Sequence, residues 1–139
     1  MTQIVFYSGA ADKLQTACRL SAKAIQQDLK VMVYALDEAL LDQMDKLLWT
    51  FSPTSFLPHS RMNSELADVT PIILGSEITQ ATHCHVLLNL DKECPPTFEL
   101  FQRLIEIAGV TAEEKQSARA RYRYYQAQGL EVNHYKLGN

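Results

Sequence analysis

Apolar positions in the first third of the chain recur with two different periods. The run QIVFYS (3–8) is apolar, β-branched and aromatic, which predicts a strand. Beyond Gly9, the apolar residues of DKLQTACRLSAKAIQQD fall at helical spacing and predict a helix that Asp12 caps. The run KVMVYAL (30–36) predicts a second strand, and DEALLDQMDKLLW predicts a second helix that again begins at an aspartate. Alternating strands and helices indicate βαβ units on a parallel sheet.

The middle of the chain is less regular. Residues 50–60, TFSPTSFLPHS, contain two prolines and two phenylalanines, and they predict a loop with a short extended piece. The runs VTPIILG (69–75) and CHVLLNL (84–90) predict two more strands. After Pro95 and Pro96, the stretch TFELFQ predicts a short helical segment. These elements extend the same sheet.

The last third of the chain predicts a strand, a long helix and an extended tail. RLIEIAG (103–109) fits either a helix or a strand, and a strand is favoured because Ile105 and Ile107 alternate with their neighbours. A helix is expected over about 112–128, ending at Gly129. The tail LEVNHYKLGN follows it in an extended conformation.

Together the elements predict a fold class. Residues 1–139 are expected to form a single three-layer α/β domain, with helices flanking a mainly parallel sheet. Folds of this type usually bind ligands at the carboxyl ends of their strands. The loop after the first strand, YSGAADKLQ, has one glycine and places Asp12 where a phosphate would lie, so it lacks the phosphate-loop pattern. We therefore expect a nucleotide-binding-like fold without a phosphate loop, and no cofactor.

Candidate catalytic and metal-binding residues are sparse. His83 and His85 would share a strand face, but Cys94 lies beyond the far end of that strand, on the order of 20 Å away. His59, in the proline-containing loop, has no partner motif that would make it catalytic. We expect no metal site, no catalytic residue and no enzymatic activity.

Composition places the chain among soluble globular proteins, with 47% hydrophobic and 21% charged residues. No apolar run is long enough to span a membrane, and the N-terminal residues lack the features of a signal peptide. Cys18, Cys84 and Cys94 are an odd number without framework spacing, which predicts free thiols in a reducing cytoplasm.

Charge is distributed unevenly along the chain. Residues 1–114 contain eight lysines and arginines against fifteen acidic residues, a net charge of −7. Residues 115–139 contain five against one, a net charge of +4. A basic C-terminal patch on an acidic body indicates a specific anionic partner.

The basic residues gather on the final predicted helix. At 100° per residue, Lys115, Arg119 and Tyr122 share one outward stripe, and Arg123 lies at its edge. The opposite stripe, expected to pack against the sheet, holds Ala120, Tyr124 and Ala127. Cations around a tyrosine suit a carboxylate next to an apolar group, and they also suit nucleic-acid phosphates. An acidic peptide is favoured because the remaining acidic body would repel a polyanion.

Three stretches resemble the chi subunit of bacterial DNA polymerase III: LLWTFSPTSFLPH (47–59), HVLLNL (85–90) and ARARYRYYQAQGLEVNHY (118–135). The resemblance covers most of the chain. It implies a non-enzymatic accessory protein of the clamp-loader assembly, with a nucleotide-binding-like fold. It also implies two partners: the psi subunit, and the acidic C-terminal tail of single-stranded DNA-binding protein, which ends in aspartates and a phenylalanine.

The resemblance also implies a tail-binding site. Its helical residues are Lys115, Arg119, Tyr122 and Arg123, with Trp49 and Phe56 as neighbouring aromatics and Val110 as an apolar wall. Two other hypotheses stay open at this point. One is direct binding of single-stranded nucleic acid by the same helix, and the other is a nucleotide-dependent enzyme.

Overall fold

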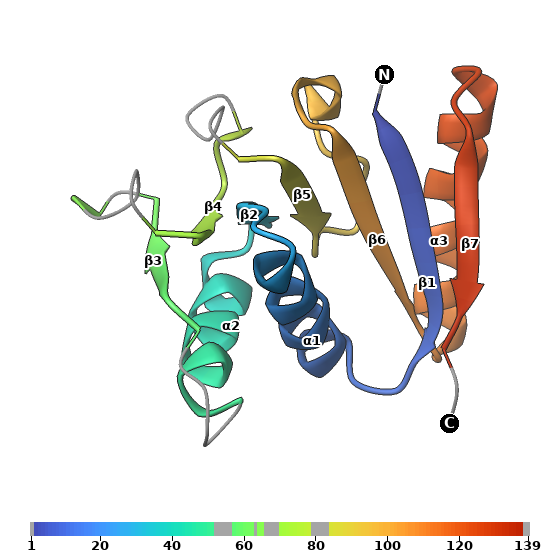
Figure 1. The fold of residues 1–139 in the computed structure, drawn as a ribbon. Coiled ribbons are helices and arrows are strands. Elements are labelled where there is room, and N and C mark those ends of the chain that lie inside the picture. The colour runs from blue at the N-terminus through green and yellow to red at the C-terminus, as the bar shows by residue number, and fades with distance from the viewer. Residues whose placement is uncertain (1, 52–56, 63, 66–69, 79–83, 138–139) are drawn as a thin grey trace.

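A parallel sheet with helices on both faces forms the molecule (Figure 1). The computed structural model describes residues 2–51, 57–62, 64–65, 70–78 and 84–137. The strands within this part are β1 (Gln3–Ala10), β2 (Val31–Tyr34), β3 (His59–Arg61), β4 (Ile72–Gly75), β5 (Val86–Asn89), β6 (Arg103–Gly109) and β7 (Val132–Lys136). The helices are α1 (Lys13–Gln26), α2 (Glu38–Thr50), the short 3-10 turn η3 (Phe98–Leu100) and α3 (Ala112–Ala127).

The seven strands of the described residues run parallel in the order β3-β4-β2-β5-β6-β1-β7. β1 lies between the two latest strands: Ile4 is in register with Leu104 of β6 and with Val132 of β7. The first strand of the chain is therefore held by its last two.

Each face of the sheet has its own core. α1 and α2 cover one face, where Cys18 and Met44 pack on β-strand residues such as Val33. α3 covers the other, where Tyr125 packs on Phe6. Because side chains alternate along a strand, β1 sends Val5 to the α1 side.

Polar residues begin each helix. The side chain of Asp12 accepts a hydrogen bond from the amide of Gln15, and that of Asp37 accepts one from Ala39. Thr111 caps α3 in the same way, through the amide of Glu114. Such caps satisfy amides that lack partners within the helix.

The predicted α/β class is confirmed, with a sheet that is parallel throughout its described strands. The strand over 103–109, for which the pattern also fitted a helix, is a strand. The tail after α3 is extended, as predicted. Its pairing with β1, as strand β7, was not predicted from the sequence. Within the described residues, no helix is both long and apolar enough to cross a membrane.

Candidate functional site

A pocket lies between α3 and the strands β1, β6 and β7, and we call it the α3 pocket. Its volume is about 400 Å³. Its lining residues are Phe6, Ser8, Gly9, Ala108, Gly109, Val110, Lys115, Ala118, Arg119, Tyr122, His134 and Lys136. Apolar and aromatic groups dominate this lining, and three cations border it.

The charge of the α3 pocket has one sign. Lys115 and Arg119 come from α3 and Lys136 comes from β7, whereas no acidic residue of the described part of the chain lines the pocket. None of these three cations makes an ion pair within the part of the chain that the structure describes. The pocket therefore favours an anionic ligand.

Aromatic contacts shape the interior of the pocket. The ring of Tyr122 lies 5.2 Å from that of Phe6, centroid to centroid, in a tilted arrangement. His134 lies at the edge of Tyr122, with the ring centroids 6.5 Å apart. Ser8 fixes the imidazole, since its Oγ is 2.7 Å from Nε2 of His134. An apolar group entering the pocket would thus meet aromatic rings from a helix and a strand.

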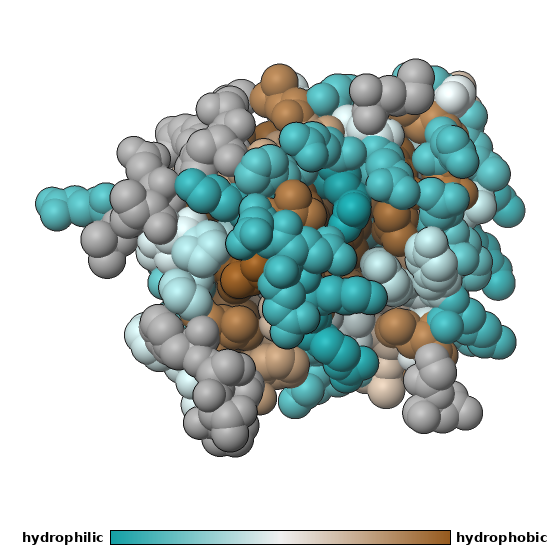
Figure 2. All heavy atoms as spheres, viewed as in Figure 1, coloured by the Kyte–Doolittle hydropathy of each residue, from teal (hydrophilic) through white to brown (hydrophobic). Residues whose placement is uncertain are grey.

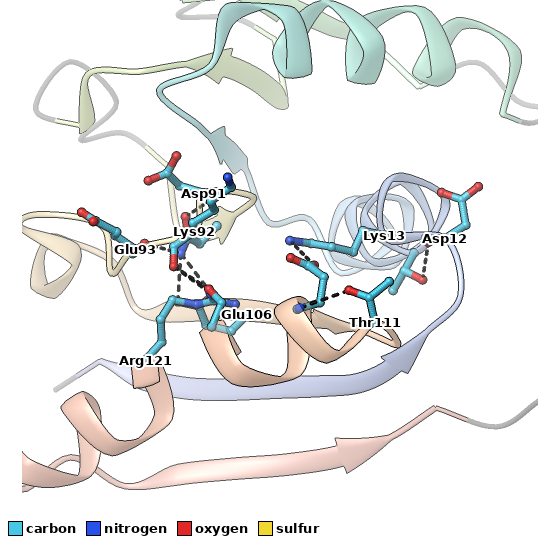
Figure 3. Close-up of polar contacts among 12 residues, drawn as sticks. Asp12, Lys13, Asp91, Lys92, Glu93, Glu106, Thr111 and Arg121 are labelled. Atoms are coloured by element: carbon cyan, nitrogen blue, oxygen red, sulfur yellow. Dashed lines mark hydrogen bonds and ion pairs between the residues drawn. The ribbon is translucent and has the colours of Figure 1, made fainter. Parts of the chain in front are cut away.

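A buried polar network holds α3 against the sheet (Figure 3). Arg121 Nε donates to Glu106 of β6 over 2.9 Å, and the hydroxyl of Tyr125 donates to the same carboxylate over 2.5 Å. Asn89 of β5 donates a further amide hydrogen bond to it. Burial raises the pKa of Glu106, while the Arg121 cation and the hydrogen bonds from Tyr125 and Asn89 act to lower it.

Further contacts of Arg121 fix its position on α3. Its Nη1 donates to the carbonyl of Lys92 and to the hydroxyl of Ser117. These bonds, with the Glu106 ion pair, leave Arg121 only 4% exposed. The guanidinium is therefore a structural group and is not part of the basic surface.

The inward face of α3 differs from the predicted one. Ala118, Arg121 and Tyr125 are the buried residues of this helix. Ala120, Tyr124 and Ala127, which were expected to pack on the sheet, are exposed, and this prediction was wrong. The prediction placed the more apolar side of the helix against the sheet. In the structure Arg121 and Tyr125 face the sheet instead, because both donate hydrogen bonds to the buried carboxylate of Glu106.

The structure brings together four of the predicted site residues. Lys115, Arg119, Tyr122 and Val110 all line the α3 pocket. Arg123 is exposed on α3 but is not among the lining residues.

Of the two aromatic residues expected beside the site, the structure describes Trp49 but not Phe56. Trp49 lies on α2, on the opposite face of the sheet, with its ring 4.8 Å from that of His59 in β3. β3 and β7 are at opposite ends of the strand order, so the structure does not bring Trp49 to the pocket. Phe56 lies outside the described residues.

Sequence reasoning missed the strand residues of the pocket, above all Phe6, His134 and Lys136. The alternation of His134 and Lys136 in the tail was a signal for one shared face, but their partner strand was unknown. Phe6 looked like an ordinary core residue.

The carboxyl edge of the sheet has a different character. A cavity of about 640 Å³ there is lined by both cations and acids, including Lys13, Asp37, Asp91 and Glu114. Lys13 Nζ is 3.0 Å from Glu114, an ion pair visible in Figure 3. Among the residues that the structure describes, no cluster of three or more potential ligands could hold a metal.

Comparison with known proteins gives a consistent result. Residues 1–133 match the family model described as DNA polymerase III chi subunit, HolC. The chain is 32% identical over 141 residues to the DNA polymerase III subunit chi of Pseudomonas aeruginosa, covering 99% of this chain and 98% of that protein. The subunit chi of Haemophilus influenzae is 28% identical, with 89% and 87% covered, and that of Escherichia coli is 22% identical, with 86% and 82% covered. The chain therefore belongs to the DNA polymerase III chi subunit family.

Proposed function

We propose that this chain is a non-catalytic adaptor of the DNA polymerase III holoenzyme. In this role it joins the clamp loader, through the psi subunit, to single-stranded DNA-binding protein in the cytoplasm. The α3 pocket would hold the acidic, phenylalanine-terminated tail of that protein. The observation that supports this most directly is an aromatic pocket bordered by three cations that, among the residues the structure describes, have no ion-pair partner and no acidic neighbour in the lining.

The chemistry of such a tail matches the pocket group by group. Arg119 and Lys115 offer donors for the terminal carboxylate and the acidic side chains. The phenyl ring would enter the pocket beside the packed rings of Tyr122 and Phe6, where burial of apolar surface contributes to affinity. Lys136, at the β7 side, would meet the acidic residues that precede the phenylalanine.

The basic helix alone suits a peptide better than a nucleic-acid backbone. Arg121 is buried in an ion pair, so α3 exposes fewer cations than its sequence contains. Of the exposed ones, Lys115 and Arg119 border a hollow with a mainly apolar and aromatic lining instead of forming a continuous track for phosphates. Direct binding of single-stranded nucleic acid by α3 is therefore the second candidate.

The experiment is a titration of labelled tail peptide, with and without its last phenylalanine. Arg119→Ala and Tyr122→Ala are each expected to weaken binding of the intact tail by about tenfold or more, because each removes a charged donor or a ring wall. Binding should also weaken as salt concentration rises. Arg19→Ala is the matched control, since Arg19 is an exposed helical arginine on α1.

Equal affinity for both peptides, or unchanged affinity in both variants, would reject the pocket as the tail site. Association with psi is tested separately, by co-purification of the two chains. Arg119→Ala should leave that association intact if the tail pocket and the psi surface are different.

A further inference from the structure

A second cavity lies on the other face of the same strands, and we call it the α1 groove. It has a volume of about 370 Å³ and runs between α1 and the strands β6, β1 and β7. Its polar and aromatic lining residues are Gln3, Tyr7, Lys23, Gln27, Arg103 and Tyr135. In Figure 2, which looks onto this face, hydrophilic and hydrophobic residues lie side by side over the strands to the right of α1.

Two tyrosines form an aromatic platform in the α1 groove. Tyr7 and Tyr135 are in register on neighbouring strands. Their ring centroids are 5.6 Å apart and their planes are 25° from parallel, so the rings stack. Tyr135 is 55% exposed, although it lies in a sheet. A flat, accessible aromatic surface of this kind can stack a planar ligand.

Two cations accompany the platform. Lys23 comes from α1 and Arg103 from the start of β6, and none of the acidic residues that the structure describes lines the groove. Neither cation has an ion-pair partner among the described residues. Glu131 lines a separate, smaller hollow that shares Gln3 with the groove. On a chain with a net charge of −3, a groove without acids marks a site for an anion.

The remaining polar groups of the α1 groove suit the edge of a nucleobase. Gln3 and Gln27 present amides, which both donate and accept hydrogen bonds. The edge of a nucleobase also has donors and acceptors, whereas a carboxylate only accepts. Stacking rings, amides and cations within one groove therefore match a base and its phosphates together.

We propose that the α1 groove binds a short segment of single-stranded DNA. A base stacks on the exposed ring of Tyr135, which Tyr7 supports from its other side, and the adjoining phosphates lie near Arg103 and Lys23. This contact would be direct and independent of the α3 pocket, because the two sites lie on opposite faces of the sheet. The chain would then hold DNA and a protein tail at the same time.

The test is fluorescence anisotropy of a labelled oligothymidylate at low salt, with the full chain. Arg103→Gln and Tyr135→Ala are each expected to weaken binding about fivefold or more, the effect of losing a phosphate contact or a stacked base. Lys136→Gln and Tyr124→Ala are matched controls. Lys136 is the next residue along β7 but faces α3, and Tyr124 is 48% exposed on α3. Both controls should bind like the unsubstituted chain.

Three outcomes would overturn the proposal. The first is no binding of the oligonucleotide by the unsubstituted chain. The second is an equal loss in Arg103→Gln and Lys136→Gln, which indicates diffuse electrostatics. The third is displacement of the oligonucleotide by the acidic tail peptide, which places the DNA in the α3 pocket. Thermal unfolding of each variant checks that a lost signal does not come from a lost fold.

Discussion

Glu106 is a fully buried carboxylate, and its partners determine how α3 sits on the sheet. It accepts hydrogen bonds from Arg121, Tyr125 and Asn89, which belong to a helix and a neighbouring strand. Loss of any one of these partners would leave the buried carboxylate incompletely paired and would destabilise the fold. The network therefore fixes the rotation of α3, and with it the direction in which Arg119 points.

Arg121→Leu is predicted to lower the free energy of unfolding by about 3–5 kcal/mol, since Glu106 would remain buried without its cation. The loss should be smaller at acid pH, where Glu106 can take up a proton. Urea unfolding at pH 8 and pH 5 measures both effects. Arg123→Leu, at an exposed position of the same helix, should change stability by no more than about 0.5 kcal/mol.

The burial of Arg121 beside Glu106 could not be predicted from the sequence. Helical spacing places Arg119 and Arg123 on the outward side of α3 and does not include Arg121 there, but only the position of Glu106 explains why Arg121 is buried. The family resemblance implied that Trp49 lies beside the basic site, but its helix lies on the other face of the sheet. Long-range pairings of this kind leave no local pattern to detect.

At the scale of elements, α3 and the strands β1, β6 and β7 build the α3 pocket. Thr111 begins α3, and the side chain of Glu114 in its first turn pairs with Lys13 of α1. Gly109, just before the helix, lies so close to this glutamate that an added Cβ would be 3.0 Å from its Cγ. The start of α3 is thus fixed by a cap, an ion pair and a close approach.

Thr111→Ala is expected to lower stability by about 1 kcal/mol, because the amide of Glu114 loses its acceptor. Thr111→Ser keeps the hydroxyl and should retain most of that stability. Thermal or urea unfolding of both variants provides the comparison. Equal losses in the two would mean that the methyl group of Thr111, and not its hydroxyl, stabilises the helix start.

Helices were predictable where the spacing of apolar residues and a capping residue indicate the same starting point. The spacing of apolar residues and the aspartates before them predicted α1 and α2, and both begin after those aspartates. β7 was predictable only as an extended tail, because pairing with β1 joins residues far apart in the chain. Five of the twelve residues that line the α3 pocket come from these two strands, and the cations of α3 alone do not reveal them.

At the scale of the whole molecule, the thiols and phenols of the core have one feature in common. Burial raises the pKa of Cys18 to about 12 and that of Cys84 to about 11. Burial also raises the pKa of Tyr7, Tyr34 and Tyr125. All five groups are neutral when protonated, so the folded state retains their protons longer than the unfolded state does.

Stability is therefore predicted to fall as pH rises from about 9 towards 11. In that range the unfolded chain releases protons that the folded chain keeps, and each buried thiol steepens the fall by up to about 1.4 kcal/mol per pH unit. Urea unfolding at pH 8, 9 and 10 measures the slope. Cys18→Ala should make it shallower, and an unchanged slope would mean that this thiol already titrates in the folded state.

The position of β1 has a consequence for synthesis of the protein. Gln3 of β1 pairs in register with Arg103, and β7 closes the other side of the strand later still. At about 5–20 residues per second, translation separates β1 from its first strand partner by roughly 5–20 s. During that interval its apolar residues have no sheet to join, which makes the nascent N-terminal segment a natural client for chaperones at the ribosome.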